Sequence, residues 1–371
     1  MPRSKNNVTI LALYDRISVF HTLSPWLNGM HGGFKLTFTD DHQWCLSKDR
    51  NDHLIIVRRF LKPPVTDMPL LELLRQRYAR IFFMNGNAGG GLHRPEVLPY
   101  VDRFYNKALF TDRTLYTKQL YGGELFTHDA HQRLGIVDNP SVITPAVPIE
   151  LLKRIHNHWN IGVGAFPRRT WPQRAAVAAA RTHFLGPRWS RLVVSQSSIV
   201  ASAPFCLLPE QSYSIDVNAR LGAPGYPTIR SHRDSLGKIL DDAAATARWT
   251  VALNRVSPKQ FFTDLQRSRI TFSPFGWGEV CFRDFEAIRA GSLLLKPDMD
   301  HLQTWPNIYR PGITYVPVRW DGSDLAAKIQ YYLDHSMERR EIIAEAYRVL
   351  RQELAQLPER SAEILKELVN G

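Results

Sequence analysis

The sequence predicts an α/β protein made of two successive halves, each with a parallel sheet and helices packed on its faces. Three observations lead to this prediction. The chain has 371 residues, more than one hydrophobic core usually organises. Short apolar strand patterns alternate with helical patterns through both halves. Three prolines cluster in DNPSVITPAVPIE, residues 138–150, which is typical of a boundary between domains.

The first half begins with a strand pattern and continues as an alternation. Apolar runs predict strands at 8–14, 53–60 and 81–86, and helical spacing predicts a helix at 68–80. The loop GNAGGGLHRP then follows the last of these strands. Open α/β sheets bind ligands at the carboxyl ends of their strands, so this loop is a candidate ligand site.

The second half repeats the alternation. WNIGVGAF, residues 159–166, predicts its first strand and a glycine turn, and further strands and helices follow in order. The strands are expected at 191–196, 213–219, 249–254, 269–273, 293–295 and 313–318, and the helices at 235–247, 258–268, from about 280, and at 322–335 with Ser323 as N-cap. From residue 338 onward the chain is charged and helical, with one apolar face that contains Ile342, Ile343, Ala346, Val349 and Leu350.

Three domains follow from this order. Residues 1–150 form a first domain, residues 151–336 form a second one, and residues 337–371 form C-terminal helices that we expect to pack back on the first domain. Three cysteines without metal-ligand spacing, and a start without a signal-peptide pattern, indicate a reduced, cytoplasmic setting. The net charge of +12 favours phosphate-rich ligands, nucleic acid or an anionic membrane surface.

The most informative segment is SPFGWGEVCFRDFEAIRAGSLLLKPDMD, residues 273–300. Gly276 and Gly278 allow a close approach of the backbone to a ligand, and a helix that begins near residue 280 directs its positive end at the same place. Arg283 suits phosphate oxygens, and Glu286, three residues later on the same face, suits a ribose diol. A surface ion pair between these two side chains is the alternative.

The motif RDFEAIRAGSLLLKP resembles the donor-binding segment of glycosyltransferases with two facing Rossmann-like domains, the GT-B fold, and specifically the branch similar to spore-coat glycosyltransferases and exostosins. The resemblance implies a nucleotide-sugar donor, with Arg283 on its diphosphate and Glu286 on its ribose. It implies donor contacts from the preceding loop, where Gly278 stands eight positions and Glu279 seven positions before Glu286. The common retaining pattern has two glutamates separated by seven residues. This sequence departs from it, because Gly278 stands where the first glutamate is expected and Glu279 follows one place along, so retaining and inverting chemistry both stay open.

Three further donor contacts are expected from the glycine turn of the second half, at Gly164, Arg168 and Arg169. An ordinary basic surface pair is the alternative for the two arginines. Asp298 and Asp300 resemble the metal motif of another glycosyltransferase fold, but they follow a strand in the middle of this domain. We therefore expect no metal site and no cofactor, with the nucleotide sugar as substrate.

Glycosyl transfer with inversion requires a base that deprotonates the acceptor hydroxyl. The candidates are Asp15 after the first strand, His21 on the next segment, and His93 after the GNAGGG loop. The sequence thus predicts a glycosyltransferase that acts on a glycan or lipid-linked acceptor of the polysaccharide or lipopolysaccharide type, peripheral to the inner membrane face. A nucleic-acid-binding or DNA-glycosylating protein, and a non-catalytic nucleotide-sugar-binding scaffold, remain the alternatives.

Overall fold

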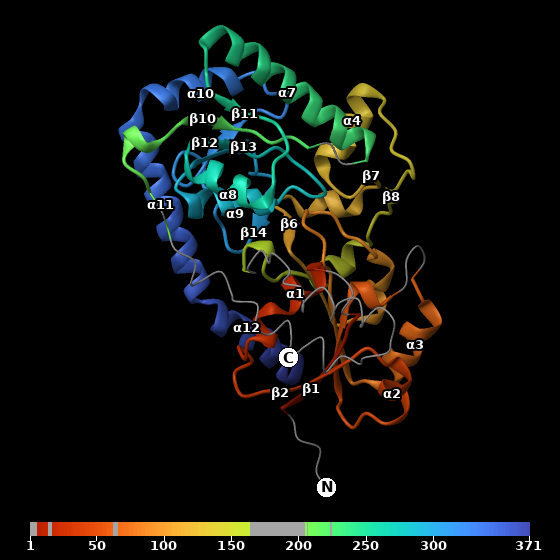
Figure 1. Ribbon diagram of the computed structural model, residues 1–371. Helices are drawn as coiled ribbons and strands as arrows, with labels where there is room; N and C mark the ends of the chain where they lie inside the picture. The colour runs from red at the N-terminus through yellow and green to blue at the C-terminus, as the bar shows by residue number, and fades with distance from the viewer. Residues whose placement is uncertain (1–5, 14–16, 62–65, 164–204, 206, 223–224) are drawn as a thin grey trace.

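The computed structural model describes residues 6–13, 17–61, 66–163, 205, 207–222 and 225–371. It contains two parallel sheets, one in each half of the chain, one above the other in Figure 1. The expected α/β fold with two Rossmann-like domains is therefore confirmed.

The first sheet has the strand order β2-β1-β3-β4-β5-β9, and every neighbouring pair in it is parallel. Its strands are β1 (Asn7–Leu11), β2 (Lys35–Thr39), β3 (His53–Val57), β4 (Arg80–Met84), β5 (Arg103–Asn106) and β9 (Ile155–Asn157), and its helices include α1 (Ile17–Leu27), α2 (His42–Ser47) and α3 (Met68–Arg77). Because β9 pairs with β5, the first sheet extends past the predicted boundary at residue 150.

The second sheet has the order β11-β10-β12-β13-β15 and is parallel throughout. Its strands are β10 (Ile215–Asn218), β11 (Val251–Ala252), β12 (Ser268–Phe272), β13 (Leu293–Pro297) and β15 (Val316–Val318), with helices α7 (Pro227–Ala247), α8 (Pro258–Gln266), α9 (Phe282–Ala290) and α10 (Leu325–Asp334). In both sheets the first strand along the chain lies between the second and the third. The two sheets therefore share one doubly wound topology.

Two sequence predictions in this half are wrong. Residues 161–163 form a short 3-10 helix and no strand, and a Cβ on Gly162 would lie 2.2 Å from the Phe285 ring, so the glycine allows helix packing. The N-cap of α10 is Asp324, and Ser323 instead donates its N–H to Asp321. The predicted strand at 191–196 lies outside the described residues.

Smaller elements join the two halves. The pair β6 (Ala108–Phe110) and β14 (Leu302–Thr304) is antiparallel and brings one strand from each half together. Helix α4 (Leu125–Leu134) of the first half packs against α7, and the two-stranded sheet of β7 (Leu120–Tyr121) and β8 (Ile143–Thr144) lies beside α4. The second half is thus held by the first at several places.

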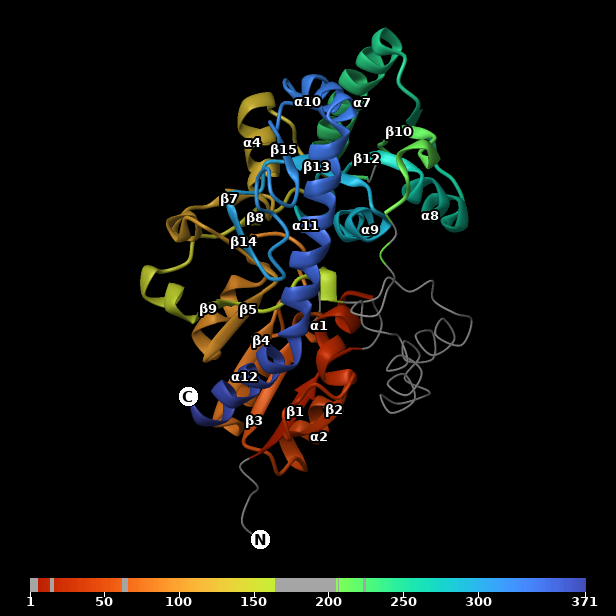
Figure 2. The ribbon, with the colours of Figure 1, turned by 90° about the vertical axis from the view of Figure 1, so that its left-hand side faces the viewer.

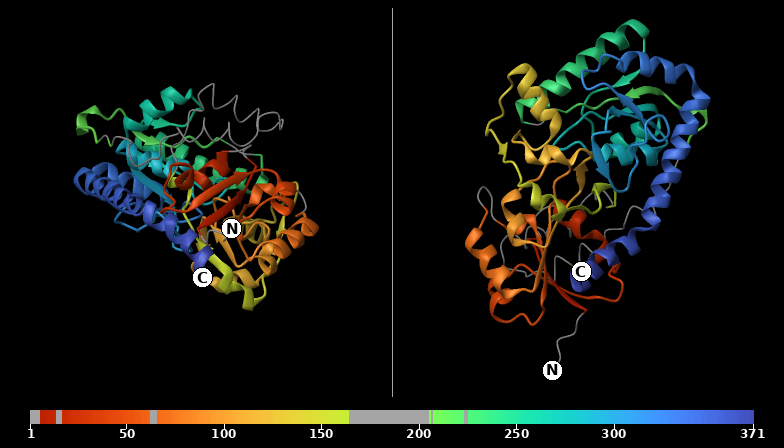
Figure 3. Two further views of the ribbon diagram at one scale, coloured as in Figure 1. Left: turned by 90° about the horizontal axis from the view of Figure 1, so that it is seen from below. Right: turned by 180° about the vertical axis from the view of Figure 1, so that it is seen from behind.

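The C-terminal helices cross from the second domain to the first (Figures 2 and 3). Helix α11 (Ser336–Ala355) packs on α9 and β13, whereas α12 (Leu357–Asn370) packs on α1 and β4. The predicted apolar face of α11 is buried, from Ile342 to Leu350. In the described part of the chain, no helix is both long and apolar enough to cross a bilayer.

Candidate active site between the two sheets

Two glycine-containing loops, one at the carboxyl end of each sheet, contact each other. One follows β4 and the other follows β12. The N–H of Val280 donates to the Ala88 carbonyl at 3.0 Å, and the N–H of Gly90 donates to Glu279 Oε2 at 3.0 Å. A Cβ on Gly278 would lie 2.6 Å from the carbonyl carbon of Ala88, so this approach requires glycine. The two carboxyl edges therefore face each other, where doubly wound sheets bind their ligands.

Glu279 is fully buried in this contact. Besides Gly90, it contacts His301, whose Nε2 lies 3.3 Å from Glu279 Oε1. The structure thus places Gly278 and Glu279, both predicted to bind the donor, in the contact between the two halves. Their donor contact stays a prediction.

Arg283 lies at the point where the strand order of the second sheet reverses. From the first turn of α9, its Nη1 donates to the Phe272 carbonyl at the end of β12 at 3.4 Å, and its Nη2 donates to the Arg220 carbonyl just after β10. Burial lowers the pKa of its guanidinium, and its Nε has no hydrogen-bond partner among the described residues. The crevice between such strands is the usual ligand position in this topology.

Glu286 follows Arg283 by almost one turn on the same helix face. Burial raises the pKa of its carboxyl to about 7, although Arg283 and Arg289 act in the opposite direction. A carboxyl group with such a pKa is poised to exchange a proton or to accept a hydrogen bond near neutral pH.

Asp284 fixes the start of α9 from inside the domain. Its carboxylate accepts hydrogen bonds from Ser273 Oγ at 2.5 Å, from Tyr309 Oη at 2.6 Å and from the N–H of Cys281 at 2.9 Å. Lys296 Nζ lies 3.1 Å from it, and both charged side chains are completely buried. This network holds the helix that carries Arg283 and Glu286 against the sheet.

His21 contacts α9 from the opposite domain. Its ring centroid lies 5.1 Å from that of Phe282, the first residue of α9. The imidazole is almost completely buried, and burial, with Lys107 nearby, lowers its pKa to about 3. Of the three predicted bases, His21 thus contacts the start of the helix that carries Arg283 and Glu286, and it is uncharged at neutral pH.

Of the predicted site residues not yet discussed, the structure describes only His93. His93 Nε2 lies 3.9 Å from Glu124 Oε1, on the loop after β4. Asp15, Gly164, Arg168 and Arg169 lie outside the described residues, and their roles stay predictions. In the described part of the chain, no group of three or more His, Cys, Asp or Glu side chains converges as metal ligands.

Lys107 and His158 belong to the same region and were not predicted. They follow β5 and β9, whose last residues, Asn106 and Asn157, are register partners. Lys107 is fully buried, its Nζ has no hydrogen-bond partner among the described residues, and burial lowers its pKa to about 7. Burial, with Lys107 nearby, also lowers the pKa of His158. Each is a polar residue directly after a strand. Ligands bind at the carboxyl ends of strands in such sheets, so this position could have identified both residues from the sequence.

We expect Asp284→Ala to destabilise the protein by about 3–5 kcal/mol, because it leaves the buried Lys296 charge without its partner. Urea unfolding monitored by tryptophan fluorescence measures this change. Glu345→Ala is the matched control, since its ion pair with Arg348 is solvent-exposed and should contribute little to stability. A loss below about 1 kcal/mol for Asp284→Ala would contradict the structural role of the network.

We expect Glu286 to make the protein less stable as pH rises. The carboxyl has a pKa of about 7 in the folded chain against an ordinary value of 4.5, so between these values the folded state holds a proton that the unfolded state has lost. Stability therefore falls across this window. Urea midpoints at about pH 5 and about pH 7.5 test this for wild type and Glu286→Gln. At the higher pH, wild type must be less stable relative to Glu286→Gln than it is at the lower pH. An unchanged difference in stability between the two proteins would contradict the raised pKa.

Comparison with known proteins places the chain in a family. No curated protein matches its sequence. Among solved structures it is similar to the pneumococcal O-GlcNAc transferase GtfA in complex with UDP and GlcNAc, with 10% identity and a TM-score of 0.46, over 89% of this chain and 60% of that one. The chain thus spans about 60% of the length of that protein.

It is also similar to the T4 phage BGT in complex with its UDP-glucose substrate, with 11% identity and a TM-score of 0.46, over 98% of this chain and 100% of that one. The family model described as "Glycosyl transferase-like" matches residues 168–365, more than half of the chain. The chain belongs to this glycosyl transferase-like family.

Proposed function

We propose that the protein is a glycosyltransferase that moves a sugar from a nucleotide-activated donor to an acceptor hydroxyl. The observation that carries the proposal is the position of Arg283 at the strand-order reversal of the second sheet, with Glu286 almost one turn further along α9. A guanidinium there suits a diphosphate, and a carboxyl group one turn away suits a ribose diol. Membership of the glycosyl transferase-like family supports the same reaction class.

In the proposed reaction, a bond forms between the acceptor oxygen and the anomeric carbon while the bond from that carbon to the diphosphate breaks. Arg283 and the N-terminus of α9 would stabilise the departing nucleoside diphosphate. The acceptor proton must pass to a base, and we propose His21 because it faces Phe282 at the start of the same helix. Burial makes His21 a weak base, but a diphosphate bound nearby would raise its pKa again.

A thermal-shift panel of nucleoside diphosphates and nucleotide sugars tests the donor site. A ligand at about 100 times its Kd stabilises the native state by about 2.7 kcal/mol, which raises Tm by several degrees. We expect one nucleotide class to give this shift in wild type and Arg283→Ala to abolish it. Arg348→Ala, an exposed arginine paired with Glu345, should keep it. No shift with any nucleotide, in a folded sample, would contradict the proposal.

For the acceptor, we propose a glycan or lipid-linked saccharide at an anionic membrane surface on the cytoplasmic side. The support is the net charge of +12. We expect sedimentation with phosphatidylserine vesicles at about 0.05 M salt, and release at about 0.3 M salt, as screening predicts. Neutral phosphatidylcholine vesicles are the control. Equal binding to both vesicle types, or preferential binding to duplex DNA in the same buffer, would overturn the membrane assignment.

A further inference from the structure

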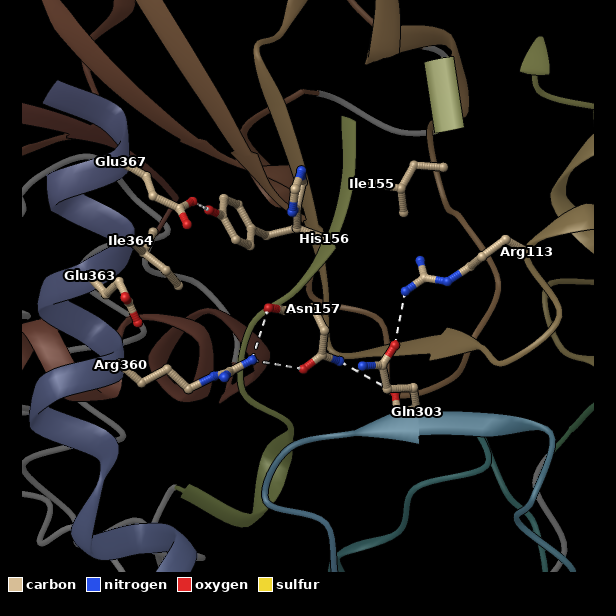
Figure 4. A pocket seen from close by; sticks show the side chains of 10 residues that line it. Arg113, Ile155, His156, Asn157, Gln303, Arg360, Glu363, Ile364 and Glu367 are labelled. Atoms are coloured by element: carbon tan, nitrogen blue, oxygen red, sulfur yellow. Dashed lines mark hydrogen bonds between the residues drawn. The ribbon is translucent and has the colours of Figure 1, made fainter. Parts of the chain in front are cut away.

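A pocket lies at the junction of the first sheet, the β6–β14 pair and α12 (Figure 4). Its volume is about 280 Å³, close to the lower end of small-molecule sites, which begin at about 300 Å³. Its walls come from the edge strand β9, from β14, from the short 3-10 helix at Arg113–Thr117 and from α12. None of the predicted donor or catalytic residues lines it.

The base of this pocket is fixed by hydrogen bonds. Arg360 Nη2 donates to the Asn157 carbonyl at 3.2 Å and to its Oδ1 at 3.3 Å, and the guanidinium lies 4.9 Å from the Trp305 ring centroid. Asn157 Nδ2 reaches the Gln303 carbonyl at 3.4 Å, and Tyr105 Oη donates to Glu367 Oε2 at 2.6 Å. These bonds hold four segments in one arrangement, so a ligand would meet a site that is already formed.

Several hydrogen-bonding groups of the walls remain unused. Among the described residues, Arg113 donates only to Gln303 Oε1, at 2.9 Å, which leaves most of its guanidinium available. Glu363, on the opposite wall, is exposed, and its charge acts on Arg360, but it makes no hydrogen bond and no ion pair within 4 Å to a described residue. In Figure 4, Glu363 and Glu367 lie on the α12 side and Arg113 lies across the pocket. The largely buried side chains of Ile155 and Ile364 also line the pocket, Ile364 on the α12 side and Ile155 on the side of Arg113.

The charges of the lining indicate the class of ligand. The two arginines are balanced by the two glutamates, and burial lowers the pKa of His156, so this histidine is neutral. A phosphate or another anion would meet Glu363 and Glu367, and a simple cation would meet Arg113 and Arg360. A neutral polyol is repelled by neither pair of charges, and each of its hydroxyls can both donate and accept hydrogen bonds.

We propose that this pocket binds one sugar residue of a saccharide, outside the site between the two sheets. Arg113 would donate to sugar hydroxyls from one wall, while Glu363 accepts from the other. The inference rests on the proposed function, since it gives that enzyme a second contact with a glycan acceptor. It narrows the acceptor to one whose chain carries a neutral sugar.

Saturation-transfer difference NMR with glucose, galactose and N-acetylglucosamine tests the pocket directly. We expect at least one sugar to bind with millimolar affinity, and Arg113→Ala and Glu363→Ala each to weaken it about tenfold or more, because each removes charge-assisted hydrogen bonds. Lys118→Ala is the matched control, an exposed cation close in sequence to Arg113 that does not line the pocket. Arg283→Ala should leave sugar binding unchanged while it abolishes the nucleotide shift.

Three outcomes overturn the inference. No sugar binds, sugar binding survives both pocket substitutions, or a charged ligand binds in place of sugars, tested with inorganic phosphate as the anion and free glutamine as a zwitterion. The nucleotide panel reports separately on the proposed function. A nucleotide shift without sugar binding refutes the pocket alone. Sugar binding at Arg113 without any nucleotide shift refutes the donor site alone.

Discussion

The rest of the structure depends on the contact between the loop after β4 and the loop after β12. Glu279 accepts from the Gly90 amide, and Gly278 lies so close to Ala88 that no side chain fits between them. This contact fixes the carboxyl ends of the two sheets opposite each other. His21 of the first domain contacts Phe282 at the start of α9 across this junction, so the glycines that allow the two loops to approach each other matter for the assembly of the two domains.

The class of fold was readable from the sequence because apolar runs and helical spacing alternate strongly, as in the segments that became β4 and α11. Boundaries were less accurate. A strand was expected within residues 159–166, but residues 161–163 form a 3-10 helix, because Gly162 packs against Phe285 of α9 and this segment does not pair in a sheet. Strand β9 escaped prediction because its three residues, Ile155–Asn157, give no period of two to recognise. Its pairing with β5 depends on tertiary structure, which a local sequence pattern does not show.

The candidate site was partly readable. The spacing of Arg283 and Glu286 predicted one helix face, and the structure places both on α9. The spacing could not reveal that the intervening Asp284 is the anchor of the helix, because its partners Lys296 and Tyr309 are distant in sequence. Glu279 was predicted to contact the donor, and the structure adds a contact with Gly90 of the other domain that the sequence could not reveal. Lys107 and His158 needed the strand register to bring them together.

The crossing of the C-terminal helices has a consequence for how the chain is made. Helix α12 covers α1 and β4 of the first domain, yet it is synthesised only after the whole second domain. Leu365 and Leu368 of α12 are fully buried there, so until they arrive the first domain exposes the apolar surface that receives them. Domains usually fold one after another as they emerge from the ribosome. Here the first domain stays incomplete until the segment after the second domain has been synthesised, and its exposed apolar surface favours aggregation during that time.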